Sequence, residues 1–127
     1  MFDYTVTSQK DFEQTVDSLK QALADFKFGV LWEFDVAAKL KEKGVDYREK
    51  LRILEVCNPQ RAKAVLEVNV RAGYFLPCKV VVYVENGVSK IGMARPASLI
   101  ALLGDDRLQE EAASVERDLI AAIDKAK

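Results

Sequence analysis

Two cysteines, Cys57 and Cys78, are the side chains of this sequence best suited to covalent, redox or soft-metal chemistry. The chain of 127 residues contains no histidine, which removes most of the hydrolase and metal-site designs that work near neutral pH. The cysteines belong to two short motifs, Cys57-Asn58-Pro59 and Leu76-Pro77-Cys78, each at the predicted end of a strand. Together these motifs define a candidate thiol or ligand site, but the sequence shows no set of catalytic side chains around it that would indicate a specific reaction.

Each cysteine has a local reason for a lowered thiol pKa. Cys57 precedes Asn58 and Pro59, the residue types preferred at the N-cap and first position of a helix, where free backbone N–H groups stabilise an anion. The register of a hairpin predicted between strands 79–85 and 88–94 places Cys78 opposite Arg95 when it is continued outward. A guanidinium in that position favours the thiolate.

Other roles for these side chains remain open. Free cysteine is often a buried, small apolar residue, and the two cysteines can form a structural disulfide only if their Cα atoms lie within about 7 Å. Arg95 is either an ordinary solvent-facing charge or a group that recognises a carboxylate or phosphate. The sequence identifies no metal, cofactor or small-molecule ligand.

Three carboxylates are further candidates for functional groups. Glu33 and Asp35 share one face of a predicted strand. The pair could serve in acid–base catalysis, but the simpler interpretation is that this face of the sheet is exposed to solvent. Glu55 lies on an otherwise apolar strand, and exposure at a sheet edge is its simplest explanation. Phosphate loops, dinucleotide fingerprints, paired CxxC zinc patterns and serine–histidine triads are absent from the sequence.

Composition is that of an ordinary globular domain, and residues 1–127 are expected to form one. The 19 basic and 20 acidic residues give a net charge of −1, which argues against nucleic acid as the main partner. The N-terminus lacks a basic region followed by an apolar stretch, and no run of about 18 apolar residues occurs. We therefore expect a cytoplasmic protein that does not bind membranes and keeps its thiols reduced.

Alternating strand and helix patterns predict an α+β fold with about five strands in a largely antiparallel sheet and helices packed on it. Residues 28–36 alternate with period two, which predicts that Trp32 packs in the core. Ser8 is expected to cap the first helix. The predicted strands are 2–7, 28–36, 51–57, 79–85 and 88–94, and the predicted helices are 8–26, 36–43, 61–68, 97–103 and one from about 105 onward.

Three segments resemble the domain-of-unknown-function family numbered 302. They are residues 30–35, 53–59 and 76–83, and the Cys-Asn-Pro and Leu-Pro-Cys elements in that order are the specific part of the match. The resemblance implies an α+β fold similar to the TATA-binding-protein class and a homodimer. It assigns no reaction, and fold similarity does not imply nucleic-acid binding. It also draws attention to Cys57, Asn58, Pro59, Pro77 and Cys78.

Two functional hypotheses follow. The first is a non-catalytic, homodimeric binding or interaction protein, in which the apolar segment 99–103 contributes to an interface or a ligand pocket. The alternative is a thiol site, redox-active or holding a soft metal or cofactor, with Cys57 and Cys78 as the reactive groups and Arg95 as the charge that tunes them.

Overall fold

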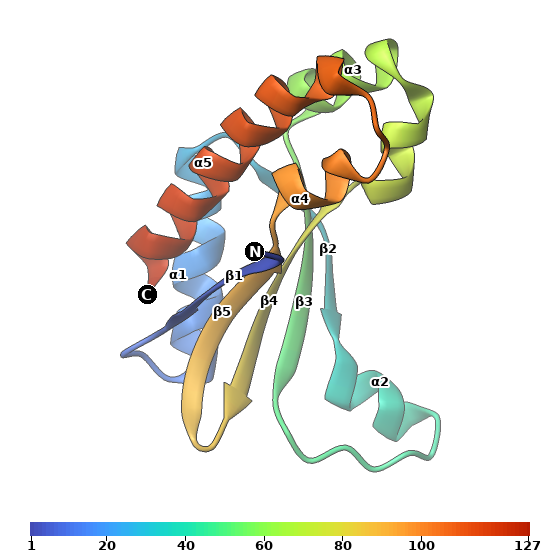
Figure 1. Ribbon diagram of the computed structural model, residues 1–127. Coiled ribbons are helices and arrows are strands. Elements are labelled where there is room, and N and C mark those ends of the chain that lie inside the picture. The colour runs from blue at the N-terminus through green and yellow to red at the C-terminus, as the bar shows by residue number, and fades with distance from the viewer.

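Five antiparallel strands form one sheet in the computed structural model, which describes residues 1–127 (Figure 1). The strands are β1 (Asp3–Thr7), β2 (Gly29–Asp35), β3 (Leu51–Cys57), β4 (Cys78–Glu85) and β5 (Val88–Ala94), in the spatial order β1-β5-β4-β3-β2. The helices are α1 (Phe12–Asp25), α2 (Val36–Glu42), α3 (Pro59–Val68), α4 (Pro96–Ala101) and α5 (Gln109–Ala126), with short 3-10 helices η1 (Val70–Phe75) and η2 (Asp106–Leu108). The predicted α+β class with five antiparallel strands is confirmed.

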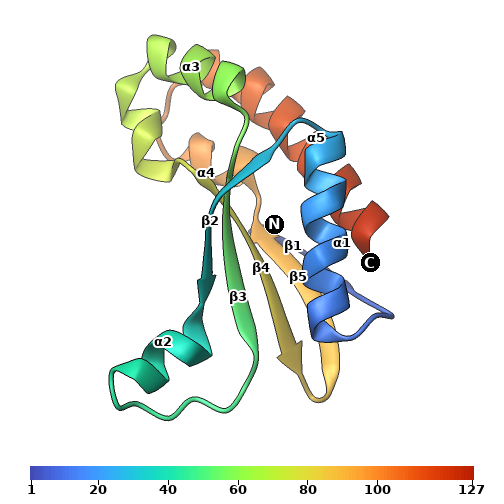
Figure 2. The ribbon, with the colours of Figure 1, turned by 180° about the vertical axis from the view of Figure 1, so that it is seen from behind.

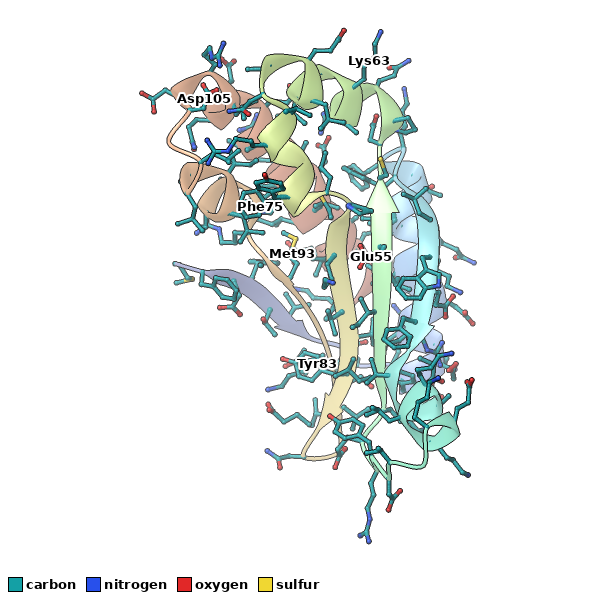
Figure 3. All side chains as sticks on the ribbon, turned by 90° about the vertical axis from the view of Figure 1, so that its right-hand side faces the viewer. Glu55, Lys63, Phe75, Tyr83, Met93 and Asp105 are labelled. Carbon is teal, nitrogen blue, oxygen red and sulfur yellow. The ribbon has the colours of Figure 1, made fainter.

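The helices cover one face and one end of the sheet. Helices α1 and α5 lie side by side on one face, whereas α3, α4 and η1 gather beyond the end of β3 (Figures 1 and 2). The other face, called the open sheet face below, is turned toward the viewer in Figure 3 and carries no helix along most of its length. No helix here combines the length and the apolar character that crossing a membrane requires.

Two separate apolar cores result from this arrangement. The main core packs the inner sheet face against α1 and α5 and includes the fully buried Leu19, Val80 and Leu119. A smaller upper core joins α3, η1, α4 and α5. It consists of Val65, Ala72, Ile100, Leu108 and Ala112.

Local signals place most of the element ends correctly. Asn58 caps α3, with Pro59 in the first turn, and Asn86 and Gly87 take the positive φ angles of 54° and 77° that the predicted hairpin turn requires. The prediction that Ser8 caps the first helix is wrong. The N-cap is Asp11, whose carboxylate accepts the Gln14 N–H at 2.8 Å. Ser8 instead continues the sheet, because its N–H donates to the Ser89 carbonyl at 2.8 Å.

A β-bulge in β2 reverses the expected orientation of Trp32. Val30 pairs with Val56 on β3, but Trp32 pairs with the next residue, Glu55, so that Leu31 is an extra residue in the ladder. The inserted residue shifts the period-two alternation by one position. Trp32 is therefore 57% exposed on the open sheet face and is not a core residue, contrary to the prediction.

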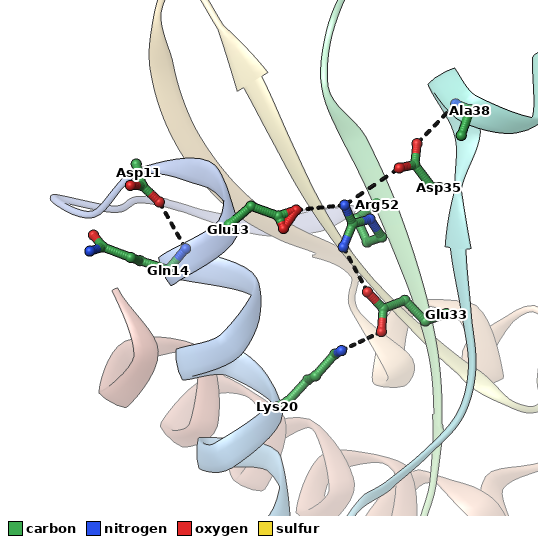
Figure 4. Close-up of polar contacts among 8 residues, drawn as sticks. All are labelled: Asp11, Glu13, Gln14, Lys20, Glu33, Asp35, Ala38 and Arg52. Carbon is green, nitrogen blue, oxygen red and sulfur yellow. Dashed lines mark hydrogen bonds and ion pairs between the residues drawn. The ribbon is translucent and has the colours of Figure 1, made fainter. Parts of the chain in front are cut away.

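The same bulge turns Glu33 and Asp35 toward α1. The Arg52 guanidinium lies between them, with Nη1 2.7 Å from Glu33 Oε2 and Nη2 3.5 Å from Asp35 Oδ2 (Figure 4). Glu13 and Lys20 of α1 pair with Arg52 and Glu33 respectively. The expectation of a solvated sheet face for these carboxylates is wrong, since they belong to an ion-pair network that joins β2, β3 and α1.

Candidate functional site

A cavity of about 570 Å³ lies between the main core and the upper core. Its origin is the separation of β4 from β5. The predicted hairpin register is confirmed, with Tyr83 paired to Lys90, but the pairing extends only as far as Val81 with Gly92. Beyond that point β4 leads to η1 and β5 leads to α4, and the space that opens is covered by helices (Figure 3).

The lining of the cavity is mainly apolar, since 16 of its 22 residues are hydrophobic. Met93 comes from the main core, whereas Ile100 and Ala112 come from the upper core. Phe75 of η1 and Met93 of β5 lie near one another at this end of the sheet (Figure 3). The segment 99–103 contributes Leu99 and Ile100, as the pocket hypothesis expected.

Four of the six residues singled out from the sequence line this cavity, namely Cys57, Asn58, Pro77 and Cys78. The Leu76–Pro77 peptide bond is cis. Pro59 and Arg95 do not line the cavity. Pro59 is exposed in the first turn of α3, and Arg95 is directed to a partner on α5.

Arg95 does not tune Cys78. Its Nε and Nη2 donate hydrogen bonds to Glu116 Oε2 at 3.0 and 2.7 Å. The guanidinium is therefore paired with a buried carboxylate and not with the Cys78 thiol. Burial, with the nearby Cys57 and Glu55 as further causes, raises the pKa of Cys78 to about 11. The expectation of a lowered Cys78 pKa is therefore wrong, because extending the hairpin register past the last paired residues put the wrong group beside the thiol.

The two cysteines are close in the sheet, but their side chains project from opposite faces. Cys78 is opposite Val56 and packs against the main core on the inner face, whereas Cys57, one residue further along β3, is on the open sheet face. Both side chains are half-buried and free. The structure contains no group of three or more His, Cys, Asp or Glu side chains arranged to hold a metal ion. Both cysteines line the apolar cavity, but the register does not bring their thiols together on one face of the sheet.

Glu55 lies on an inner strand, so the explanation by edge exposure is wrong. Strand β2 forms the edge beyond it. Glu55 faces Lys79 across the β3–β4 ladder, and Lys79 Nζ lies 3.1 Å from Glu55 Oε1. Both residues line the cavity, and Glu55 lies on the open sheet face (Figure 3). Their charges are therefore satisfied by one another.

Sequence reasoning missed η1 and Arg61. The η1 segment contributes Tyr74 and Phe75 to the cavity, but a single 3-10 turn has no periodicity from which to predict it. The usable signal was an aromatic pair directly before Leu-Pro-Cys. Arg61 also lines the cavity and contacts α5, with its Nη2 2.8 Å from Asp118 Oδ2.

Comparisons with known proteins agree with this fold. A family profile described as domain of unknown function DUF302 matches residues 4–126. The crystal structure of an uncharacterized conserved DUF302 protein from Bacillus stearothermophilus superposes with a TM-score of 0.97 and 48% sequence identity, covering 100% of this chain and 99% of that chain. A comparison with curated proteins gives no match. The chain belongs to the DUF302 family.

Proposed function

We propose that this protein is a cytoplasmic, homodimeric, non-catalytic binding protein whose cavity holds a small, mostly apolar molecule. The observation that carries the proposal is the size and lining of the cavity between the two cores. Binding sites for small molecules commonly measure about 300 to 1,000 Å³ and are lined mainly by apolar side chains with a few polar groups. In this proposal neither nucleic acid nor a membrane is a partner.

Filling the cavity is expected to abolish binding. Ala112 is 4% exposed, lies on α5 and lines the cavity, so Ala112→Phe places a benzyl group where the ligand would lie. NMR titration with butylbenzene, followed through the methyl signal of Met93, should saturate in the wild type. We expect the dissociation constant to rise at least tenfold in Ala112→Phe, because the probe and the new ring compete for one volume.

Ala113→Phe is the matched control, since Ala113 is a half-buried neighbour on α5 that does not line the cavity. Circular dichroism checks that both variants fold. The exposed Met1 serves as an internal reference signal. Equal binding of butylbenzene by the wild type and Ala112→Phe would contradict the proposal.

The proposed homodimer uses the open sheet face. On this face Trp32 stacks on Phe34 with ring centroids 5.1 Å apart, and Ile53, Val81 and Tyr83 continue the apolar surface across β3 and β4. Trp32 is exposed and the other four side chains are half-buried. Contiguous apolar surface that solvent reaches is typical of interaction sites, and symmetric dimers are the commonest assemblies.

Trp32→Glu is expected to convert the dimer to a monomer, because it places a charge in the apolar interface. Native mass spectrometry should show twice the mass of one chain for the wild type and a single chain for the variant. Leu102→Glu is the control, since Leu102 is 77% exposed and lies on the C-cap of α4, outside the sheet. A monomeric wild type at micromolar concentration would refute the dimer.

A thiol site at Cys57 and Cys78 is the second candidate, favoured by the fact that both cysteines line one cavity. The raised pKa of Cys78, about 11, opposes thiolate chemistry at neutral pH. At pH 8 about one Cys78 thiol in a thousand is ionised. This site therefore suits a neutral thiol better than a nucleophile.

Alkylation of Cys78 by iodoacetamide in a Cys57→Ser variant is expected to be slow at pH 7 and to accelerate about tenfold per pH unit up to pH 9.5, because only the thiolate reacts. Mass spectrometry measures the rate. The same variant unfolded in urea supplies the rate of an ordinary thiol. A rate that levels off below pH 9 in the folded protein would favour the thiol-site candidate instead.

A further inference from the structure

The polar groups around the cavity indicate which chemical class of ligand it would bind. This inference rests on the proposed function. Arg61 and Lys79 are the only cationic residues in the lining. Arg61 is paired with Asp118 at 2.8 Å and lies 3.8 Å from Glu111, and Lys79 is paired with Glu55 at 3.1 Å. A ligand carboxylate or phosphate would find no unpaired cation and would face the carboxylate of Glu55, so the site disfavours anions.

Hydrogen-bond donors, in contrast, remain free. Asn58 uses its side-chain oxygen to cap α3, accepting the Arg61 N–H at 3.3 Å, and this leaves its Nδ2 without an acceptor in the protein. Arg61 Nη1 is buried and also has no acceptor. The Cys78 thiol keeps its proton at neutral pH because its pKa is about 11. The polar part of the lining therefore offers donors to a ligand, while its one acidic residue, Glu55, is paired with Lys79.

We propose that the cavity binds an uncharged, mostly apolar molecule that carries a carbonyl oxygen, and that the Asn58 side-chain amide donates a hydrogen bond to this oxygen. An aliphatic or aromatic ketone, ester or amide has this chemistry. Asn58 thereby has two roles, with its oxygen fixing the start of α3 and its nitrogen facing the ligand. The second role depends on the first, because capping holds the amide in one orientation.

Three probes with ten carbon atoms each separate the alternatives: butylbenzene, the ketone butyrophenone and the anion 4-phenylbutyrate. NMR titration through the Met93 methyl signal measures their dissociation constants. We expect butyrophenone to bind about fivefold more tightly than butylbenzene, the ratio expected for one neutral hydrogen bond. We expect 4-phenylbutyrate to bind no more tightly than butylbenzene.

Asn58→Asp is the decisive variant, because aspartate caps a helix as well as asparagine does but has no N–H to donate. The ketone preference should disappear in Asn58→Asp while butylbenzene binds within twofold of the wild type. Gln60→Glu, at an exposed position in the first turn of α3 outside the cavity, adds the same single negative charge and should keep the preference.

Equal binding of the ketone and the hydrocarbon, tightest binding of the anion, or a ketone preference that survives in Asn58→Asp would each overturn this inference. Those results leave the proposed function standing as long as butylbenzene binds and Ala112→Phe prevents it. Failure of all three probes to bind the wild type would instead refute the proposed function, and this inference with it.

Discussion

Replacing Arg95 with methionine is expected to lower the free energy of unfolding by about 3 kcal/mol, because it leaves a buried carboxylate without its cation. Glu116 is only 6% exposed, and its Oε2 accepts two hydrogen bonds from Arg95. Its Oε1 accepts the Ala97 N–H at 3.0 Å. Glu116 thus supplies, from α5, the acceptor that the N-terminus of α4 lacks, since Arg95 at the N-cap makes no side-chain cap.

Urea denaturation measures this effect, and a double variant identifies its cause. Arg95→Met combined with Glu116→Met removes the stranded charge, so we expect the double variant to be more stable than Arg95→Met alone. Lys125→Met is the control, because Lys125 and its partner Asp25 are both more than half exposed and this pair should contribute less than 1 kcal/mol. A loss below 1 kcal/mol in Arg95→Met would show that the pair does not hold α4 to α5.

The pair also matters for the cavity. Pro96, Leu99 and Ile100 of α4 all line it, so the helix that Glu116 anchors is part of the proposed binding site. Sequence reasoning placed Arg95 beside Cys78 because it could use only local register, whereas the true partner lies 21 residues away on another helix. A contact of that kind has no signature in spacing or periodicity.

Helices, strands and turns that are determined by nearby residues could be predicted from the sequence. Residues 51–57 and 88–94 form strands with the predicted bounds, because their alternation reflects which side chains meet the core. The cap at Asn58 and the turn at Asn86-Gly87 follow from residue types that satisfy a specific backbone geometry. These signals placed both cysteine motifs at strand ends, where four of the six candidate residues meet the cavity.

Features that depend on an extra residue in a strand, or on the order of strands in the sheet, could not be predicted from the sequence. A single extra residue at Leu31 reverses the faces of Trp32 and Glu33, and the sequence pattern on either side of a bulge looks continuous. The assignment of Glu55 to an edge failed because strand order is a property of the whole sheet. The cavity itself arises where two paired strands separate, which no local pattern encodes.

Replacing Arg52 with methionine is expected to destabilise the protein by about 2 kcal/mol at pH 7, because it removes the cation between three carboxylates. The Arg52 side chain is 14% exposed and donates to Glu13 and Glu33 at 2.7 Å each (Figure 4). It also lies over the Phe12 ring. Its loss leaves Glu33 and Asp35 two residues apart on the same face of β2, with Lys20 as the one remaining cation paired with Glu33.

The pH dependence tests this explanation. Burial opposes ionisation of Glu33, but hydrogen bonds from Lys20 and Arg52 outweigh it and lower the pKa of this carboxyl below its ordinary value of 4.5. A lowered pKa contributes stability that is present above about pH 4.5 and is lost as the pH falls through the folded-state value. The wild type should therefore lose this contribution in acid, whereas Arg52→Met has less of it to lose.

We accordingly expect the difference in unfolding free energy between wild type and Arg52→Met to shrink from about 2 kcal/mol at pH 7 to less than half of that at pH 3. Urea denaturation at several pH values measures it. Lys39→Met, which removes only an exposed pair with Glu42, should stay within 0.5 kcal/mol of the wild type throughout, as is usual for surface pairs (about 0 to 1 kcal/mol). A difference that is independent of pH would mean that Arg52 stabilises the protein through its packing on Phe12 and not through its charge.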